Sequence, residues 1–218
     1  MPRAARNFAG GLPHHVVARA NGGARLFGGA QDYGPFIELM AAAHERRPLD
    51  VLGYCLMPNH VHLVLRPAEG RDLSRFMQWL LTAHAARLHR RRGTTGHVWQ
   101  GRFKAFVIQA DDHLWTVLRY VERNALRAGL AAAAEAWPWG SLAARLAPPA
   151  PAWLVAPDLP AGWRDWVNEP QSAAELEAVR RSVNRGAPFG EPDWAQRTAE
   201  ALGLASTLRA RGRPSRRG

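Results

Sequence analysis

Two strand-like runs separated by a two-residue turn constrain the fold of this chain more than any other feature. Residues 49–57 and 61–66 are rich in apolar side chains and are joined at the turn-forming dipeptide Pro58-Asn59. Because so short a connection cannot carry a parallel crossover, the two runs are predicted to be antiparallel neighbours in one sheet. The chain is therefore predicted to be built around a β-hairpin.

Two histidines lie where the second run begins, His60 immediately before it and His62 within it. Side chains alternate between the faces of a strand, so His60 and His62 are predicted to project together while Val61 turns into the core. Neutral imidazole binds several divalent metals, and the pair therefore indicates half of a metal site on a rigid strand. A His-x-His pair on a strand is more often two half-buried polar residues, so both interpretations stand at this point.

Further periodic segments place this hairpin in a mixed fold. A strand is predicted at residues 14–19 and an extended segment at 98–109. Helices are predicted at residues 32–47, from Asp72 or Ser74 to Arg92, and from Asp111-Asp112 to Ala128 before Gly129. The order β-α-β-β-α-β-α predicts an α+β fold of the ferredoxin-like kind, in which helices cover one antiparallel sheet.

The composition changes after residues 139–141. The run at 148–151, Pro-Pro-Ala-Pro, is typical of a linker, and short helical patterns rich in Trp follow it. Five arginines without an acidic residue end the chain, which is typical of a disordered basic tail. We therefore predict a main domain over residues 1–147, a helical C-terminal extension over 148–208 and a basic tail over 209–218.

The charge of the chain indicates a polyanionic partner. A formal net charge of +11 and a pI near 11.4 favour nucleic acid first and an anionic membrane surface second. All of the 29 basic residues except Lys104 are Arg. A GC-rich coding bias also produces this preference, so it says little about how a partner is recognised.

The single cysteine, Cys55, excludes an internal disulfide and a multi-cysteine zinc site. Its place in an apolar strand favours a small buried thiol. No apolar run approaches the roughly 20 residues of a membrane span, and the start of the chain lacks a signal-peptide core. We therefore expect a cytoplasmic protein of bacterial type that does not bind membranes.

A second group of chemically useful residues lies on the last predicted helix of the main domain. Tyr120 and Asn124 are four residues apart and share one helix face, whereas Glu122 points elsewhere. Asn124 offers a carbonyl oxygen to a hard cation, and Tyr120 offers a phenol that could act as a nucleophile. Together with His60 and His62 this set fits Mg²⁺ or Mn²⁺, although imidazole also holds Zn²⁺. Most helical tyrosines are core residues, so this alternative stays open as well.

Several ordered motifs resemble those of the REP-associated tyrosine transposases, relatives of single-tyrosine transposases within the HUH endonuclease group. The motifs are Gly11–Val16 with Arg19 and Asn21, Tyr54–Leu63, Gly96–Ala105, Tyr120–Leu130 and Trp137–Ser141. The resemblance covers roughly residues 6 to 145, and residues 188–213 resemble a C-terminal extension seen in part of this group. Two departures are Ala125, where the family often has Pro, and Ala20, where it has Gly.

The resemblance implies an HUH endonuclease fold and a DNA strand-transfer activity. By position it makes Tyr120 the nucleophile and His60, His62 and Asn124 the ligands of a divalent metal, Mg²⁺ or Mn²⁺. The implied reaction is nicking and rejoining of single-stranded or hairpin DNA at repetitive palindromic elements through a 5′-phosphotyrosine. It implies no small-molecule cofactor, favours a monomer over a dimer, and is consistent with a nucleoid-associated protein.

Basic residues outside this set are candidates for contacts with the DNA backbone. They are Arg102 and Lys104 on the extended segment, Arg90, Arg91 and Arg92 at the end of a helix, and Arg209, Arg211 and Arg213 in the tail. For the helix-end cluster, a solvated position with a favourable dipole interaction is an equally good interpretation.

Two other functions remain possible on the sequence. One is a noncatalytic DNA-binding protein that recognises repeat hairpins and retains the fold without turnover. The other is a zinc hydrolase of small molecules, which would leave the +11 charge unexplained. The presence of all four expected catalytic side chains favours the transposase activity.

Overall fold

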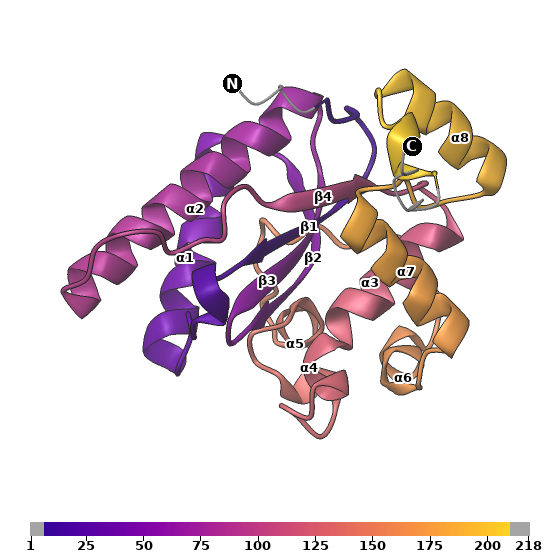
Figure 1. The fold of residues 1–218 in the computed structure, drawn as a ribbon. Coiled ribbons are helices and arrows are strands. Elements are labelled where there is room, and N and C mark those ends of the chain that lie inside the picture. Colours follow the sequence, from indigo (N-terminus) through magenta and orange to yellow (C-terminus); the bar gives the residue numbers. More distant parts are fainter. Residues whose placement is uncertain (1–6, 210–218) are drawn as a thin grey trace, which may run out of the picture.

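Four extended segments form one antiparallel sheet at the centre of the molecule (Figure 1). The computed structural model describes residues 7–209, and its strands are β1 (His14–Arg19), β2 (Asp50–Met57), β3 (His60–Arg66) and β4 (Lys104–Val107), in the order β2-β3-β1-β4. Every pair of neighbouring strands is antiparallel. The chain runs β-α-β-β-α-β through the sheet, which confirms the predicted ferredoxin-like α+β fold.

The predicted hairpin consists of β2 and β3, with Pro58-Asn59 at its turn. Strand β1 lies on the other side of β3, where Arg19 pairs with His60 and Val17 pairs with His62. Both histidines therefore lie on an inner strand that has a neighbour on each side, and such a strand holds its side chains more rigidly than a loop would.

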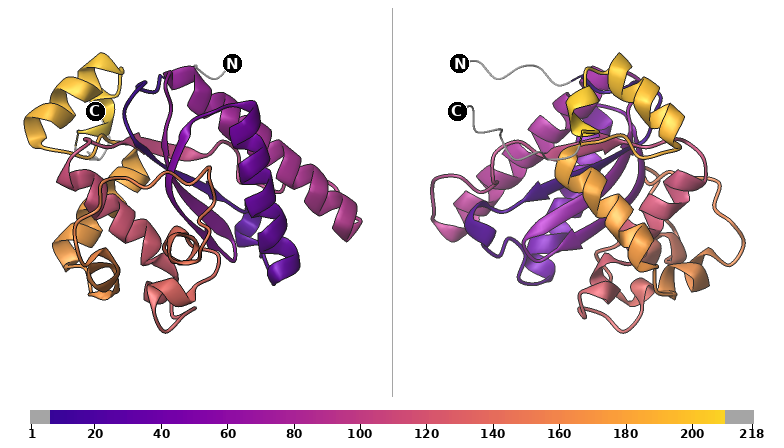
Figure 2. Two further views of the ribbon diagram at one scale, coloured as in Figure 1. Left: turned by 180° about the vertical axis from the view of Figure 1, so that it is seen from behind. Right: turned by 45° about the vertical axis from the view of Figure 1, so that its right-hand side comes forward.

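Helices α1 (Ala30–Arg46) and α2 (Gly70–Arg92) cover one face of the sheet (Figures 1 and 2). Val61, Leu63 and Leu65 of β3 turn toward these helices and are fully buried. This confirms that Val61 faces the core, as the period of two along the strand predicted.

Helix α3 (Asp112–Glu122) and the single turn α4 (Asn124–Arg127) pack on the opposite face. Cys55 is buried there among apolar side chains, in agreement with the expected small apolar thiol. The prediction of one continuous helix up to Ala128 was wrong in one detail, because the helix is interrupted at Arg123. That residue adopts φ −81° and ψ −5°, which is closer to a turn than to an α-helix.

The boundaries of two other elements also differ from the prediction. Only β4 is strand within the predicted extended segment 98–109, because Gly101 adopts a positive φ of 70° that bends the chain just before it. Helix α2 begins two residues before the predicted Asp72, because Glu69 and Asp72 form a reciprocal capping box around its first turn.

The C-terminal part of the chain covers both edges of the sheet. It contains α5 (Ser141–Leu146), α6 (Trp163–Asn168), α7 (Ala173–Arg185) and α8 (Pro192–Ala201). Short 3-10 turns occur along the whole chain, at Asn21–Gly23, Ala134–Ala136 and Ala205–Thr207. Leu154 pairs with Val51 of β2, and Phe189 pairs with Ile108 next to β4. Pairing of this kind removes the open edges at which a sheet would otherwise join another chain.

The C-terminal extension also shares a hydrophobic core with α3. Trp163 of α6 and Val179 of α7 are buried in the same cluster as Leu118 of α3 and Cys55 of β2. Residues on both sides of the boundary predicted at 147–148 therefore pack in one hydrophobic core. No helix within residues 7–209 is long and apolar enough to cross a membrane.

Candidate active site

The residues predicted to carry chemistry meet where α3 crosses the sheet. The Tyr120 ring lies edge-on above two imidazoles, with its centroid 5.9 Å from that of His62 and 6.0 Å from that of His15. His60 completes the group, with its ring centroid 4.9 Å from that of His62. Tyr120 and His62 are almost fully buried, while His60 is partly exposed. The structure therefore brings the predicted nucleophile and the predicted histidine pair together.

Hydrogen bonds fix the orientation of the two predicted metal ligands. The Nδ1 atom of His60 lies 2.6 Å from Asn59 Oδ1, an acceptor, so Nδ1 carries the proton and Nε2 keeps its lone pair. The Nδ1 atom of His62 lies 2.8 Å from His15 Nε2. A metal on His62 Nε2 would select the tautomer in which His62 Nδ1–H donates to His15. Partners of this kind orient the histidine ligands of metal sites in general.

Burial keeps these imidazoles neutral. Loss of solvent lowers the pKa of His15 to about 3, and loss of solvent together with the nearby Arg19 and Arg127 lowers that of His60 to about 4. Burial also lowers the pKa of His62 well below its usual value, with smaller contributions from His15 and His60. Only a neutral imidazole offers a lone pair to a metal, so the electrostatics suit the predicted ligand role.

Arg127 links the two functional residues of the helix. Its guanidinium carbon lies 4.3 Å from the centre of the Tyr120 ring, and its Nη2 donates a hydrogen bond to Asn124 Oδ1. Burial lowers the pKa of Arg127, although the guanidinium remains charged at neutral pH. The oxygen that was predicted to face a metal is thus bound to an arginine in this structure.

The donor set fits a divalent metal in part. Among residues 7–209, no group of three or more His, Cys, Asp or Glu side chains is close enough to hold a metal ion. His60 and His62 are therefore the two strong ligands, and Asn124 could add its oxygen only after exchanging its bond to Arg127. Oxygen atoms of a DNA phosphate would supply the rest of a hard-cation site.

Two buried ionic groups hold α3 in place over the sheet. The Glu122 carboxylate accepts hydrogen bonds from Ser141 Oγ at 2.6 Å and Trp163 Nε1 at 2.7 Å, and lies 3.5 Å from Arg145. Burial raises the pKa of Glu122, an effect that Arg145 partly opposes. As predicted, Glu122 points away from Tyr120, and it ties α3 to the C-terminal extension.

Arg119 makes the second connection. Its guanidinium donates to the backbone oxygens of Trp166 at 2.8 Å and Glu169 at 2.9 Å, and it forms an ion pair with Glu175 at 3.4 Å. These bonds join α3 to α6 and to the first turn of α7. The C-terminal extension therefore determines where α3 lies, and with it Tyr120.

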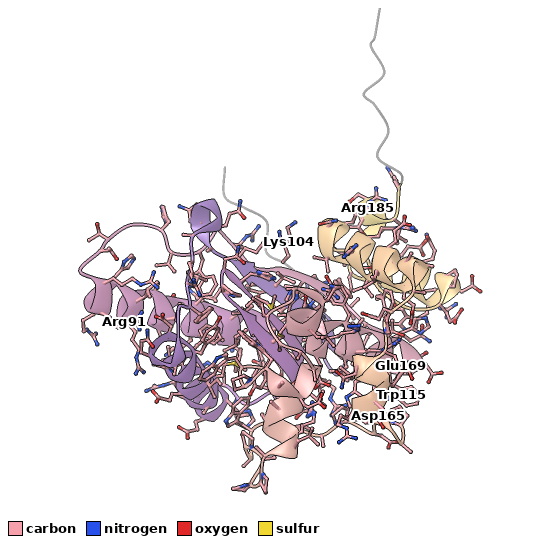
Figure 3. The ribbon with its side chains drawn as sticks, turned by 90° about the horizontal axis from the view of Figure 1, so that it is seen from below. Arg91, Lys104, Trp115, Asp165, Glu169 and Arg185 are labelled. Atoms are coloured by element: carbon pink, nitrogen blue, oxygen red, sulfur yellow. The ribbon has the colours of Figure 1, made fainter. Side chains whose placement is uncertain are left out.

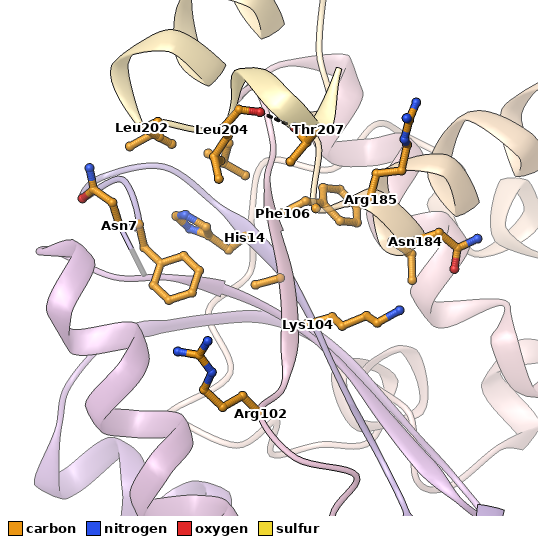
Figure 4. A pocket seen from close by; sticks show the side chains of 16 residues that line it. Asn7, His14, Arg102, Lys104, Phe106, Asn184, Arg185, Leu202, Leu204 and Thr207 are labelled. Atoms are coloured by element: carbon orange, nitrogen blue, oxygen red, sulfur yellow. Dashed lines mark hydrogen bonds between the residues drawn. The ribbon is translucent and has the colours of Figure 1, made fainter. Parts of the chain in front are cut away.

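Two of the predicted DNA-contact residues line a pocket of about 500 Å³ between β4 and the C-terminal extension (Figure 4). Arg102 and Lys104 come from one wall, while Asn184 and Arg185 come from α7 on the other. None of the residues His60, His62 and Tyr120 lines this pocket. One residue of its wall connects it to them, since Phe106 packs against His15 with 5.0 Å between ring centroids.

The helix-end arginines are bound within the protein. Arg91 forms an ion pair with the buried Asp32, and Arg92 donates to the backbone oxygens of Arg25 at 3.1 Å and Leu26 at 2.8 Å. In Figure 3, Lys104 and Arg185 lie on one side of the molecule, and Arg91 lies apart from both. Arg91 and Arg92 therefore have a structural role, and their contact with DNA remains a prediction.

The other predicted basic contacts are less constrained. Arg90 is exposed at the end of α2. Arg209 is the last described residue, and its backbone oxygen accepts a hydrogen bond from Arg185. Arg211 and Arg213 lie outside the described residues.

Sequence reasoning gave no role to His15 or Arg127. Arg127 is three residues after Asn124 and seven after Tyr120, so helical spacing already placed it on their face. His15 could not be found in this way, because its position beside His62 depends on the register between β1 and β3.

Comparisons with known proteins agree with this fold. The sequence model of the family described as Transposase IS200 like matches residues 11–124, more than half of the chain. A curated Haemophilus influenzae protein, named as a candidate REP-associated tyrosine transposase, is 25% identical over 107 residues. That match covers 44% of this chain and 61% of the relative, so the chain spans about three-fifths of the curated relative's length.

A solved structure shares the fold. It is a REP-associated tyrosine transposase bound to a REP hairpin, and it matches with a TM-score of 0.56 at 17% identity. The match covers 79% of this chain and 100% of that one. The fold, the meeting of Tyr120 with two histidines, and the family match agree, and the chain belongs to the IS200-like transposase family.

Proposed function

We propose that this protein nicks and rejoins single-stranded or hairpin DNA through a transient bond between Tyr120 and a 5′-phosphate. The observation that carries this proposal is the placement of the Tyr120 ring over His62 and His15, with Arg127 against it. A phenol, neutral imidazoles and a cation gathered in one place suit attack on a phosphodiester.

The reaction exchanges one phosphodiester for another. The Tyr120 oxygen forms a bond to phosphorus while the bond from phosphorus to the 3′-oxygen breaks. The phenol proton passes to water, and the released 3′-oxygen takes up a proton. Because the number and type of ester bonds do not change, the reverse reaction can rejoin the strand without an energy source.

The residues of the chain have separate roles in this reaction. His60 and His62 would hold the divalent metal, with His15 orienting His62 through its hydrogen bond. When bound, Mg²⁺ or Mn²⁺ would polarise the scissile phosphate. Arg119 and Glu122 hold α3 so that Tyr120 remains above the histidines.

The proposed substrate follows from charge and from the relatives. The +11 net charge favours a polyanion, and a solved relative of the same fold is bound to a REP hairpin. We therefore propose a hairpin with adjoining single-stranded DNA as the substrate.

The test is a search for the covalent intermediate. A hairpin DNA labelled at its 3′ end is incubated with the protein and Mn²⁺, because a 5′-phosphotyrosine keeps the 3′ fragment attached to the protein. We expect a labelled protein-sized adduct that a 5′ label does not give and that EDTA abolishes. Tyr120→Phe should lose the adduct completely while it retains DNA binding.

The chain offers matched controls, since Tyr33 and Tyr54 are its two other tyrosines. Both are buried on the opposite side of the sheet, so Tyr33→Phe and Tyr54→Phe should form the adduct normally. Tight hairpin binding by the wild type without an adduct under any metal would favour the noncatalytic DNA-binding protein instead.

A further inference from the structure

Arg127, which is half-buried but has a buried Nη1 atom, differs from Arg119 and Arg145 on the same side of the sheet. Arg119 is paired with Glu175 at 3.4 Å, and Arg145 lies 3.5 Å from Glu122. Within the described part of the chain, Arg127 has no carboxylate within ion-pair distance; its contacts are the neutral side chains of Tyr120 and Asn124. Buried charges in proteins are normally compensated by an opposite charge, so an anion is missing here.

Hydrogen-bond donors at the same place are also unused. The Nη1 of Arg127 and the Nδ2 of Asn124 are both buried and lack an acceptor among residues 7–209. The two side chains contact each other, so the unused donors belong to one small region. Unsatisfied buried donors are rare in folded proteins, and two together indicate a ligand rich in acceptor oxygens.

The position of this region identifies the ligand. The Arg127 guanidinium lies 4.3 Å from the centre of the Tyr120 ring, and that ring lies 5.9 Å from the imidazole of His62. An anion bound to Arg127 would therefore lie next to the proposed nucleophile and near the proposed metal ligands. In a DNA-nicking reaction the group at that place is the phosphate under attack.

We infer that Arg127 is a catalytic residue that binds a nonbridging oxygen of the scissile phosphate, with Asn124 Nδ2 as a second donor. This inference rests on the proposed function and adds a residue to it. A planar guanidinium presents two parallel N–H groups to phosphate and stabilises the negative charge that develops during attack. The bound phosphate would in turn compensate the positive charge of the Arg127 guanidinium.

The experiment is a double-mutant cycle between the protein and single phosphates of the DNA. All proteins carry Tyr120→Phe, so only binding is measured. Hairpins with a single methylphosphonate, which replaces one charged oxygen by a methyl group, are scanned along the unpaired strand. We expect one position at which the substitution weakens binding about 10-fold when Arg127 is present and has no further effect with Arg127→Ala.

Two further variants sharpen the result. Arg127→Lys keeps the charge but loses the fork and should give an intermediate loss. Arg164→Ala removes an exposed arginine of α6 and should leave the cycle unchanged. Thermal unfolding of each variant shows that it is folded before its affinity is compared.

The outcomes separate the two proposals. Additive effects of Arg127→Ala and methylphosphonate at every position would overturn the assignment of Arg127, whatever the adduct assay shows. A non-additive position together with no covalent adduct from the wild type would keep the phosphate contact and overturn the nicking activity.

Discussion

The two faces of the sheet are built from similar strands but are filled in different ways. The face under α1 and α2 is packed with apolar and aromatic side chains. Among them, Phe36, Met40 and Phe76 are fully buried. The face under α3 contains imidazoles, a phenol and a guanidinium within one contact network. The same β3 strand supplies Leu63 to the first face and His62 to the second.

This difference shows how one small sheet can provide both stability and chemistry. Among the described residues, the buried side-chain atoms on the first face that lack a hydrogen-bond partner are His14 Nε2 and His84 Nδ1. On the second face, His15, Asn124 and Arg127 each have a buried polar atom that lacks a hydrogen-bond partner within residues 7–209. Such groups lower stability and are typical of functional sites.

The largest effect on stability is expected on the first face. Met40 is fully buried on α1, and Met40→Ala should lower the free energy of unfolding by about 2–5 kcal/mol through lost packing and a cavity. Urea unfolding measures this change. Adduct formation per folded molecule should stay at the wild-type level; a matching loss of adduct formation would show that the faces are not independent.

A smaller effect is expected from acid, and one buried histidine on each face serves to test it. Burial lowers the pKa of His84 to about 4 and that of His62 well below its usual value. The unfolded chain binds these protons more tightly, so the stability present above about pH 6.5 is lost as the pH falls toward the folded pKa. Between pH 7 and pH 5, the free energy of unfolding of His84→Gln should therefore fall by up to about 2 kcal/mol less than that of the wild type.

His62→Gln should also flatten the pH dependence of unfolding, and it should additionally abolish the covalent adduct. His84→Gln should leave adduct formation unchanged at pH 7. Chemical unfolding at both pH values checks the first expectation, and the labelled hairpin checks the second. An undiminished acid sensitivity in both variants would mean that other groups cause it.

The smallest effects are expected from two exposed cations at different places. Lys104→Ala should weaken hairpin binding and reduce the slope of log affinity against log salt by about 1, as loss of one phosphate contact does. Arg91→Ala should leave that slope unchanged and lower stability by about 1 kcal/mol, because Asp32 loses one of its two arginine partners. Equal changes of slope in both variants would make α2 part of the DNA-binding surface.

The sequence predicted most of the fold because its patterns are local. Alternation along residues 61–66 and the two-residue turn at Pro58-Asn59 require only neighbouring residues. The capping box at Glu69 and the interruption at Arg123 were missed, since the first uses an unusual cap and the second depends on the backbone of one residue.

By itself the sequence determined the histidine pair, the helical pair of Tyr120 and Asn124, and the excess of positive charge. Spacing along one strand or one helix fixes which side chains share a face, and this holds before any tertiary contact forms. Only the tertiary structure decided that His15 supports His62, that Arg119 and Glu122 place α3, and that Arg127 has no acid beside it among residues 7–209. These facts depend on strand register and on packing between distant segments, which no local pattern specifies.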